Sequence, residues 1–283
     1  MATIKKILAI ANPTRSHQPA CERAFALAKA LDAELRLHAV VYEPTANFDL
    51  FHIADGDHLQ HSLKHQAEEL LEEIRCPMSA TGTVSISTSA QWAHPFDRGV
   101  RQAIETDWPD LVMLSTRDAH RLSAAEWRIL HASEIPVWLV RDRPWPTQAK
   151  IGAFVDPASP NSAHSKADVE VLRWAIALQE FAHEVKVHHA MGVDPRSDDN
   201  SEQHRTDQIE QRIRDFTDSP LTMTIAPVEP ATLIRGFGGL ADAGLAVLGV
   251  FSRLRLTELL IGSTAREVIP ALNCDVLAVP ADR

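Results

Sequence analysis

The sequence is short of three things, and each shortage argues against a class of protein. It has no apolar run close to the roughly 20 residues that a membrane-spanning helix needs. Its three cysteines, Cys21, Cys76 and Cys274, are odd in number and lack CxxC spacing, so neither a disulfide framework nor a cysteine metal site is expected. Positive charge is also scarce, with 28 basic residues against 38 acidic ones and a formal net charge of −10. Such a surface repels nucleic-acid backbones and anionic lipid.

What remains is a globular protein with 45% hydrophobic and 23% charged residues. The opening stretch MATIKKILAIANP has a short apolar core that ends at Asn12-Pro13, which is typical of a first β-strand rather than of a secretory signal. The low cysteine content favours the reducing cytoplasm. At about 100–200 residues per domain, 283 residues suggest two domains. We therefore expect a cytoplasmic protein with no membrane segment and no broad nucleic-acid binding.

Three short segments of the first half recur in the second half, in the same order and at a similar spacing of about 140 residues. Their order and common spacing indicate a duplication, with one domain at 1–143 and another at 148–283. A stretch rich in proline and charge, DRPWPT at Asp142–Thr147, is predicted to be the linker. The recurring pairs are Ile4–Pro13 with Lys150–Pro157, Asp110–Ser115 with Gly244–Gly249, and Ile135–Val140 with Cys274–Val279.

Within each half, short apolar segments rich in β-branched residues alternate with segments of helical periodicity. This alternation predicts an α/β protein of two tandem Rossmann-like domains, each a five-stranded parallel sheet with helices on both faces. The predicted strands are 4–11, 34–42, 84–89, 111–115, 137–140, 151–155, 184–191, 221–225, 245–248 and 276–279. The predicted helices are 20–31, 59–74, 96–104, 123–130, 166–179, 202–216, 231–240 and 263–268.

Ligands of an open α/β sheet bind beyond the carboxyl ends of its strands, and the second half has two candidates there. Asp156 follows the first strand and could accept a hydrogen bond from a ribose hydroxyl or an adenine amine, although turn or cap aspartates are as common. Gly249 ends the fourth strand, where a glycine lets the backbone approach a phosphate. Gly262-Ser263-Thr264 begins the last helix. Its free N–H groups could attract an anion, or the segment could be an ordinary helix cap. Arg253, in the loop between them, could add charge.

These residues resemble the nucleotide-binding pattern of the universal stress proteins, an aspartate after the first strand and Gly-x2-Gly-x9-Gly-Ser/Thr after the fourth. The second part stands here as Gly249-x2-Ser252-x9-Gly262-Ser263. The resemblance covers both halves, so the chain looks like a tandem member of the family. It is most similar to the E-type members in PVWLV at 136–140, PWP at 144–146 and ALNCDVL at 271–277.

The resemblance implies an adenine nucleotide alpha hydrolase-like fold that can hold ATP, or another adenine nucleotide, in the second half. Ser252 replaces the family's second glycine, and a position that needs φ > 0 would disfavour serine. Phe251 adds bulk to the same loop, so we expect weak binding. The residues implied in binding are Asp156 and Ala190 for adenosine, and Gly249, Ser252, Arg253, Gly262, Ser263 and Thr264 around the phosphates.

The first half departs further from the pattern. Asn12 stands in place of the aspartate and Ser115 in place of the first glycine. No glycine occurs from Ser115 to Ser133, and a loop without glycine cannot easily bring its backbone against a triphosphate. The first half is therefore predicted to be a degenerate domain that does not bind nucleotide.

Other polar and aromatic residues have simpler interpretations. His58, His61 and His65 recur at helical spacing and could bind zinc or nickel, but a solvated helix face is the favoured interpretation. His188 and His189 are predicted to point to opposite faces of a strand, with one of them buried and hydrogen-bonded. Five tryptophans of the first half are expected in the core and between the domains: Trp92, Trp108, Trp127, Trp138 and Trp145.

The sequence thus predicts a cytoplasmic stress-response protein that binds ligands or protein partners. It favours a binding protein over an enzyme. The alternatives are an ATP-hydrolysing or phosphate-transferring enzyme and a carrier of an apolar, lipid-like ligand. Against the enzyme, the P-loop lysine motif is absent. The resemblance also implies pairing of the two halves, because members of the family often dimerise through their last strands and each half carries one, Val137–Val140 and Val276–Val279. We therefore expect an internal pseudo-dimer, and a homodimer of whole chains stays open.

Overall fold

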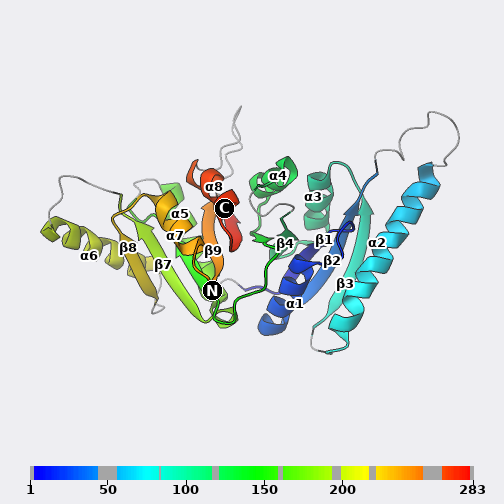
Figure 1. Ribbon diagram of the computed structural model, residues 1–283, viewed down its shortest axis with the longest axis horizontal. Helices are drawn as coiled ribbons and strands as arrows, with labels where there is room; N and C mark the ends of the chain where they lie inside the picture. The colour runs from blue at the N-terminus through cyan, green and yellow to red at the C-terminus, as the bar shows by residue number, and fades with distance from the viewer. Residues whose placement is uncertain are drawn as a thin grey trace.

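A computed structural model describes residues 3–43, 56–82, 84–116, 121–158, 162–192, 199–216, 221–250 and 263–280 of the chain. Ten strands within these residues form one sheet, in the order β3-β2-β1-β4-β5-β10-β9-β6-β7-β8. Figure 1 shows the resulting elongated molecule, with the first half of the chain at one end and the second half at the other.

The bounds of these elements follow the predicted alternation of strand and helix. The strands are β1 (Lys6–Ala11), β2 (Glu34–Val41), β3 (Ile86–Trp92), β4 (Leu111–Ser115), β5 (Val137–Val140), β6 (Lys150–Phe154), β7 (Glu184–Ala190), β8 (Thr222–Ala226), β9 (Ala243–Val250) and β10 (Asp275–Pro280). The helices are α1 (Pro19–Leu31), α2 (Gly56–Ser79), α3 (Phe96–Asp107), α4 (Ala124–Ala132), α5 (Ser162–Ala177), α6 (Asp199–Phe216), α7 (Pro230–Gly238) and α8 (Ser263–Val268). Two short 3-10 turns are η2 (Gln179–Phe181) and η3 (Ile269–Ala271).

Each half contributes five parallel strands, and the α/β fold class is confirmed. In the first half β1 lies between β2 and β4, and in the second half β6 lies between β7 and β9. The two five-stranded sheets are not separate, because β5 and β10 pair antiparallel with Trp138 opposite Leu277. The predicted pairing of the last strands is therefore confirmed. It gives each strand a partner for the edge that would otherwise stay open.

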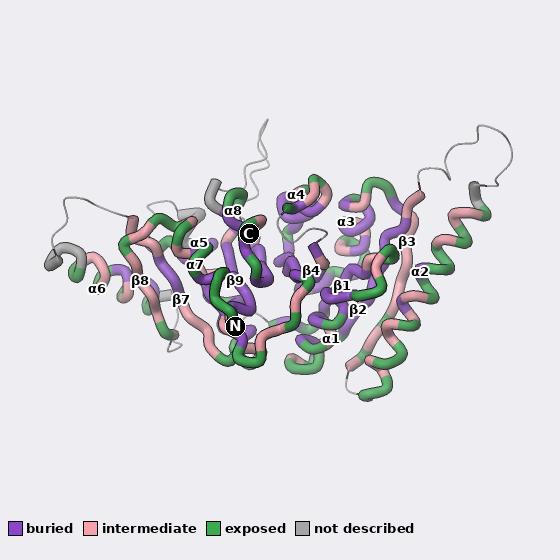
Figure 2. Tube along the Cα trace, viewed as in Figure 1, coloured by how far each residue is buried: buried purple, intermediate pink, exposed green. Residues whose placement is uncertain are grey.

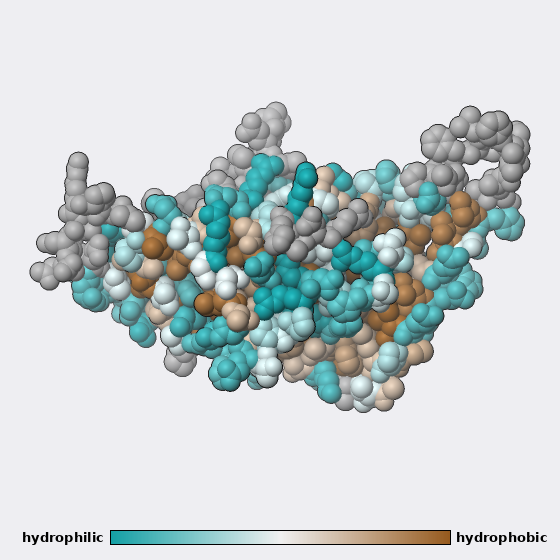
Figure 3. Space-filling model, in the orientation of Figure 1, coloured by the Kyte–Doolittle hydropathy of each residue, from teal (hydrophilic) through white to brown (hydrophobic). Residues whose placement is uncertain are grey.

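Helices cover both faces of the sheet because successive residues of a strand point to opposite sides. On β1, Ile7 belongs to the apolar core under α1, α2, α5 and α6, whereas Leu8 belongs to the core under α3, α4, α7 and α8. Figure 2 shows the consequence: the central strands are buried, and the edge strands β3 and β8 are only partly so. Hydrophilic side chains cover much of the face shown in Figure 3, with apolar residues gathered toward its two ends.

Two element bounds differ from the prediction for identifiable reasons. Helix α2 continues past the predicted end at residue 74 and includes Pro77 in its last turns. The carbonyl that loses its N–H partner there belongs to Glu73, which is exposed to water. Strand β3 begins at Ile86 and runs to Trp92. As a half-exposed edge strand, it carries the polar sequence ISTSAQW, which weakens the apolar signal used to place it.

Candidate functional site

A cavity of about 190 Å³ lies at the carboxyl ends of β6 and β7, where an open α/β sheet binds its ligands. Asp156, just after β6, and Ala190, the last residue of β7, both line it. The sequence predicted these two residues as an adenosine site, and the parallel register of β6 and β7 brings them together. The opposite wall comes from α6.

Asp156 is held by its main chain and presents its carboxylate to solvent. Its backbone N–H donates to Asp168 Oδ1 at 2.9 Å, while its side chain is 56% exposed. Asp168 is buried on α5, and this burial, together with the charge of Asp156, raises the pKa of Asp168 to about 7 against the N–H donor that lowers it. A carboxyl that titrates near neutrality therefore lies directly behind the strand end.

His189 closes the inner side of the same cavity. It is 2% exposed, and its Nδ1 lies 3.0 Å from the Val155 carbonyl oxygen and 4.0 Å from Asp156 Oδ1. Because a carbonyl only accepts, Nδ1 must be the protonated nitrogen in that contact. Nε2 is then left as an acceptor that has no hydrogen-bond partner among the described residues.

Two arginines of α6 form the outer wall, and sequence reasoning missed them. Arg205 donates from Nη2 to the Met191 carbonyl oxygen at 3.2 Å, and Arg212 donates from Nη1 to the Pro157 carbonyl oxygen at 3.1 Å. With Gln208 they recur at i, i+3 and i+7, the spacing of one helix face. In the sequence, the signal that could have identified this wall was the spacing of these polar residues on one helix face next to Ile209, which is buried. These bonds use one N–H of each guanidinium, so both groups can offer further donors to an anion or to a base.

Gly249 lies beside this site on the neighbouring strand. Leu248 of β9 pairs with Phe154 of β6, so Gly249 is level with Val155, one residue before Asp156. A Cβ at Gly249 would come within 3.1 Å of the Ala167 Cβ on α5. Close packing of α5 is therefore sufficient to require a glycine here, whether or not a phosphate approaches.

The remaining predicted phosphate residues fall in or next to the part of the chain that the structure does not describe. Ser263 and Thr264 are the first residues of α8, and their side chains are outside the described set. Ser252, Arg253 and Gly262 lie outside the described residues altogether.

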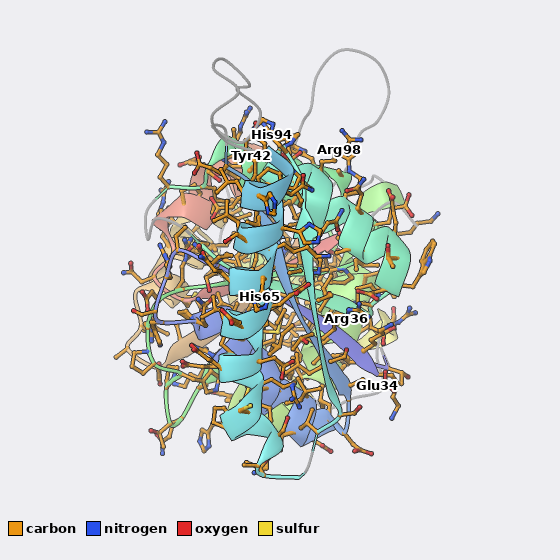
Figure 4. All side chains as sticks on the ribbon, turned by 90° about the vertical axis from the view of Figure 1, so that its right-hand side faces the viewer. Glu34, Arg36, Tyr42, His65, His94 and Arg98 are labelled. Atoms are coloured by element: carbon orange, nitrogen blue, oxygen red, sulfur yellow. The ribbon has the colours of Figure 1, made fainter. Side chains whose placement is uncertain are left out.

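At the corresponding strand ends of the first half, the side chains form hydrogen bonds within the chain. Asn12 Oδ1 accepts from the N–H and the hydroxyl of Thr14 at 3.0 and 2.8 Å, which makes it a turn residue. Ser115 Oγ accepts from the N–H of Ala20 at 3.1 Å, in the first turn of α1. At the end of β2, the ring of Tyr42 stacks on His94 with centroids 4.0 Å apart, as Figure 4 shows.

The histidines and tryptophans are placed mostly as predicted. His58, His61 and His65 are exposed along α2, where His65 lies 3.4 Å from Glu69 (Figure 4). The described residues contain no group of three or more potential metal ligands. His188 and His189 do point to opposite faces, against α7 and α6. Both are buried, and His189 is the one with a hydrogen bond to a described residue, so the prediction of one buried, hydrogen-bonded histidine is confirmed.

His188 has an apolar environment, and neither of its ring nitrogens has a hydrogen-bond partner in the part of the chain that the structure describes. It packs between Phe154 and Phe237, and this burial lowers the pKa of His188 to about 4. Among the tryptophans, Trp138 and Trp145 pack together at the junction of the halves with Phe181, as predicted. Trp108 departs from the prediction, because its side chain is exposed.

Comparison with known proteins shows which proteins this arrangement is similar to. Residues 3–141 match the Universal stress protein family. The whole chain is 24% identical to universal stress protein E of Salmonella typhi and of Escherichia coli K12, covering 100% of this chain and 96% of each of those proteins. It is 23% identical to the homologue from Haemophilus influenzae, with 97% of both chains covered.

Solved structures share the fold over the full length. A putative universal stress protein from Pseudomonas aeruginosa UCBPP-PA14 superposes with a TM-score of 0.72 at 22% identity, covering 99% of this chain and 94% of that one. A universal stress protein from Archaeoglobus fulgidus gives a TM-score of 0.68 at 16% identity, covering 98% of both chains. In the part of the chain that the structure describes, no helix is both long and apolar enough to cross a membrane.

Proposed function

We propose that this protein serves in a stress response and binds an adenine nucleotide in its second half. Residues 3–141 match the universal stress protein family, and the whole chain is similar to universal stress protein E. One observation carries the proposal. Asp156 and Ala190, far apart in sequence, line one cavity whose other wall supplies Arg205 and Arg212. A carboxylate, a small residue and two cations match the hydroxyls, the flat base and the phosphates of a nucleotide.

In this proposal each residue has a separate task. The Asp156 carboxylate accepts hydrogen bonds from the ribose hydroxyls, and Ala190 leaves space for the base. Arg205 and Arg212 offer N–H donors and a flat cationic surface, which suits both stacking and phosphate binding. The phosphates extend toward Gly249 and the start of α8, with Ser252, Arg253, Gly262, Ser263 and Thr264 completing the site as the family resemblance implies.

We assign binding, rather than hydrolysis, to this site. Asp168 has a pKa near neutrality but is buried behind Asp156 and does not line the cavity. It therefore does not face the cavity that we assign to the nucleotide.

We further propose two domains, 1–143 and 148–283, of which the first has lost nucleotide binding. Its strand ends are filled by the Asn12 turn and the Ser115 hydrogen bond.

We also propose that the protein works in the reducing cytoplasm. All three cysteines are free, and Cys21 and Cys274 are buried. Burial raises the pKa of each buried thiol to about 12, which keeps it protonated and unreactive.

A second copy of the chain cannot pair through the last strands, because β5 and β10 already pair within one chain. Any homodimer must use another surface.

The first test is native mass spectrometry of the purified chain, with adenine nucleotides added in excess. We expect one nucleotide per chain and no release of inorganic phosphate on prolonged incubation with ATP. Arg212→Ala should reduce occupancy, whereas Arg214→Ala is the matched control, since Arg214 is exposed on α6 and pairs only with Glu210 among the described residues. Two nucleotides per chain, steady phosphate release or equal effects of the two substitutions would each contradict the proposal.

A further inference from the structure

Asp168 of α5 fixes the point at which the chain leaves β6 and turns toward the proposed nucleotide site. The N–H of Val155 still donates to the His188 carbonyl oxygen of β7 at 3.1 Å. The next N–H, that of Asp156, donates instead to Asp168 Oδ1 at 2.9 Å. The residue whose carboxylate lines the cavity is therefore held through its main chain by a buried acid of another element.

The same acid lies beside the strand end toward which we propose that the phosphates extend. Ala167 precedes Asp168 on α5, and a Cβ at Gly249 would come within 3.1 Å of the Ala167 Cβ. Asp168 thus binds the main chain of one proposed ligand residue, Asp156, while its neighbour packs on another, Gly249. A change of charge at Asp168 would act on both ends of a bound nucleotide.

The second oxygen of Asp168 is poorly placed to carry a negative charge. Oδ2 is buried and has no hydrogen-bond partner in the part of the chain that the structure describes, and the residue as a whole is 4% exposed. Burying a carboxylate without a cation or several donors is costly, so the protonated form is favoured. Burial and, to a smaller extent, the charge of Asp156 raise the pKa of Asp168 to about 7, in agreement with this geometry.

The charged side chains of the nearby helices do not act as a counter-ion. On α5, Lys166 and Glu170 are each two residues away from Asp168, a spacing that places them on other sides of the helix. Arg205 and Arg212 of α6 each donate to a main-chain carbonyl oxygen at the strand ends rather than to Asp168. Both arginines therefore act on the cavity and not on the acid behind it.

The strands under α5 bring one titratable side chain close to Asp156. His189 of β7 has its Nδ1 3.0 Å from the Val155 carbonyl oxygen and 4.0 Å from Asp156 Oδ1. The other charged residues of β6, β7, β10 and η2 lie toward the amino ends of the strands, at the far end of the sheet: Lys150, Glu180, Glu184, Lys186 and Asp275. Among the described residues, Asp156 is thus the charged group that acts on Asp168.

We propose that Asp168 makes nucleotide binding depend on a proton, an inference that rests on the proposed function of the second half. While protonated, Asp168 is neutral and its Oδ1 holds the Asp156 N–H. Once the proton leaves to solvent, a second negative charge lies behind Asp156 and repels the phosphates. The nucleotide therefore binds more tightly to the protonated form, and affinity falls as pH rises through neutrality. Because the two equilibria are linked, bound nucleotide also favours the protonated acid.

Calorimetric titration of the full chain with ATP at pH 6 and at pH 8 tests this coupling. A terminal phosphate also titrates near pH 6, so the quantity compared is the ratio of the two affinities in the wild type and in Asp168→Asn. The variant keeps an acceptor for the Asp156 N–H and cannot ionise. Between pH 6 and pH 8 we expect the wild type to lose about fivefold more affinity than Asp168→Asn, as for two charges separated by partly solvated protein.

Two further variants separate the charge of Asp168 from its role in positioning. Asp168→Ala removes the acceptor of the Asp156 N–H and should weaken ATP binding severalfold at both pH values. Asp168→Asn should instead bind ATP more tightly than the wild type at pH 8. Glu170→Gln is the matched control, since it removes a carboxylate of the same helix that pairs with Arg173 at 2.8 Å, and it should keep the pH dependence of the wild type.

The carboxyl resonance of Asp168 in the NMR spectrum of the ligand-free chain, identified by its loss in Asp168→Asn, is a readout that needs no nucleotide. Its titration midpoint should lie near neutrality and move to higher pH when ATP is bound. A midpoint near the ordinary value of about 3.9 would overturn the inference and leave the nucleotide site standing.

Other outcomes also separate the two claims. Equal affinity ratios in the wild type and in Asp168→Asn, or the same change of the ratio in Glu170→Gln as in Asp168→Asn, would overturn the proton coupling alone. A chain that binds ATP at neither pH would overturn the proposed function, and this inference with it.

Discussion

Arg23 and Asp275 form a buried ion pair across the junction of the two halves, with Nη1 and Oδ2 3.0 Å apart and both side chains almost fully buried. The same Asp275 oxygen accepts from Trp138 Nε1 at 3.0 Å, and its other oxygen accepts from the Arg141 N–H at 2.8 Å. The Arg23 guanidinium also lies 4.5 Å over the ring of Trp145. One carboxylate of the second half thus binds three residues of the first.

Removing this carboxylate should destabilise the whole chain. Asp275→Ala leaves the Arg23 charge buried without its partner, which typically costs about 3–5 kcal/mol of unfolding free energy. Asp142→Ala is the matched control, since Asp142 pairs with His17 at an exposed site and should change stability by less than about 1 kcal/mol. Urea unfolding followed by tryptophan fluorescence measures both. Equal stabilities for the two variants would show that the junction does not depend on Asp275.

The junction should also hold after the linker is cut. The antiparallel β5–β10 pairing and the apolar contacts of Trp138 with Trp145 and Phe181 remain when the chain is broken at Asp142–Thr147. A protease site introduced there should yield two fragments that elute as one species from a sizing column. Fragments that separate under native conditions would mean that the covalent linker, rather than the shared sheet, holds the halves together.

Asp168 should make stability depend on pH. Its folded pKa of about 7 lies above the unfolded value of about 3.9. The folded state therefore keeps a proton that the unfolded state releases between about pH 4 and pH 7, and stability falls as pH rises through that window. Asp168→Asn keeps an acceptor for the Asp156 N–H but cannot ionise. We expect it to remove this loss, so that the variant gains on the wild type by a few kcal/mol at pH 7.5.

The comparison of Asp168→Asn with the wild type is necessary because buried histidines change stability with pH in the opposite direction; burial lowers the pKa of His38, His131 and His188. Burial lowers the pKa of His38 and of His188 to about 4, below the unfolded value of about 6.5. Their contribution to stability is lost as pH falls below 6.5 toward 4. Chemical denaturation at several pH values, taken as the difference between the two proteins, cancels the histidine terms. A difference that does not vary with pH would contradict the buried, protonated state of Asp168.

The fold was largely predictable from the sequence, because buried strands and amphipathic helices carry strong local patterns. The pairing of β5 with β10 was expected from the family resemblance, since members of the family often dimerise through their last strands and each half carries one. The arginine wall was not predicted: Arg205 and Arg212 read as ordinary charges on a polar helix, and only the packing of α6 brings them to Asp156. Trp108 was misplaced for the same reason, because composition does not tell which tryptophan the end of α3 turns into solvent.

The most direct test of nucleotide binding in one half is to exchange the two residues that follow the first strand of each half. Asp156→Asn and Asn12→Asp are matched changes in the full chain, read by calorimetric titration with ATP. We predict one site in the wild type and unchanged binding at one site in Asn12→Asp. Asp156→Asn should bind ATP at least tenfold more weakly, because a charge-assisted hydrogen bond contributes about 1.5–3 kcal/mol. Unchanged affinity in Asp156→Asn, or binding that is lost or altered in Asn12→Asp, would contradict the account.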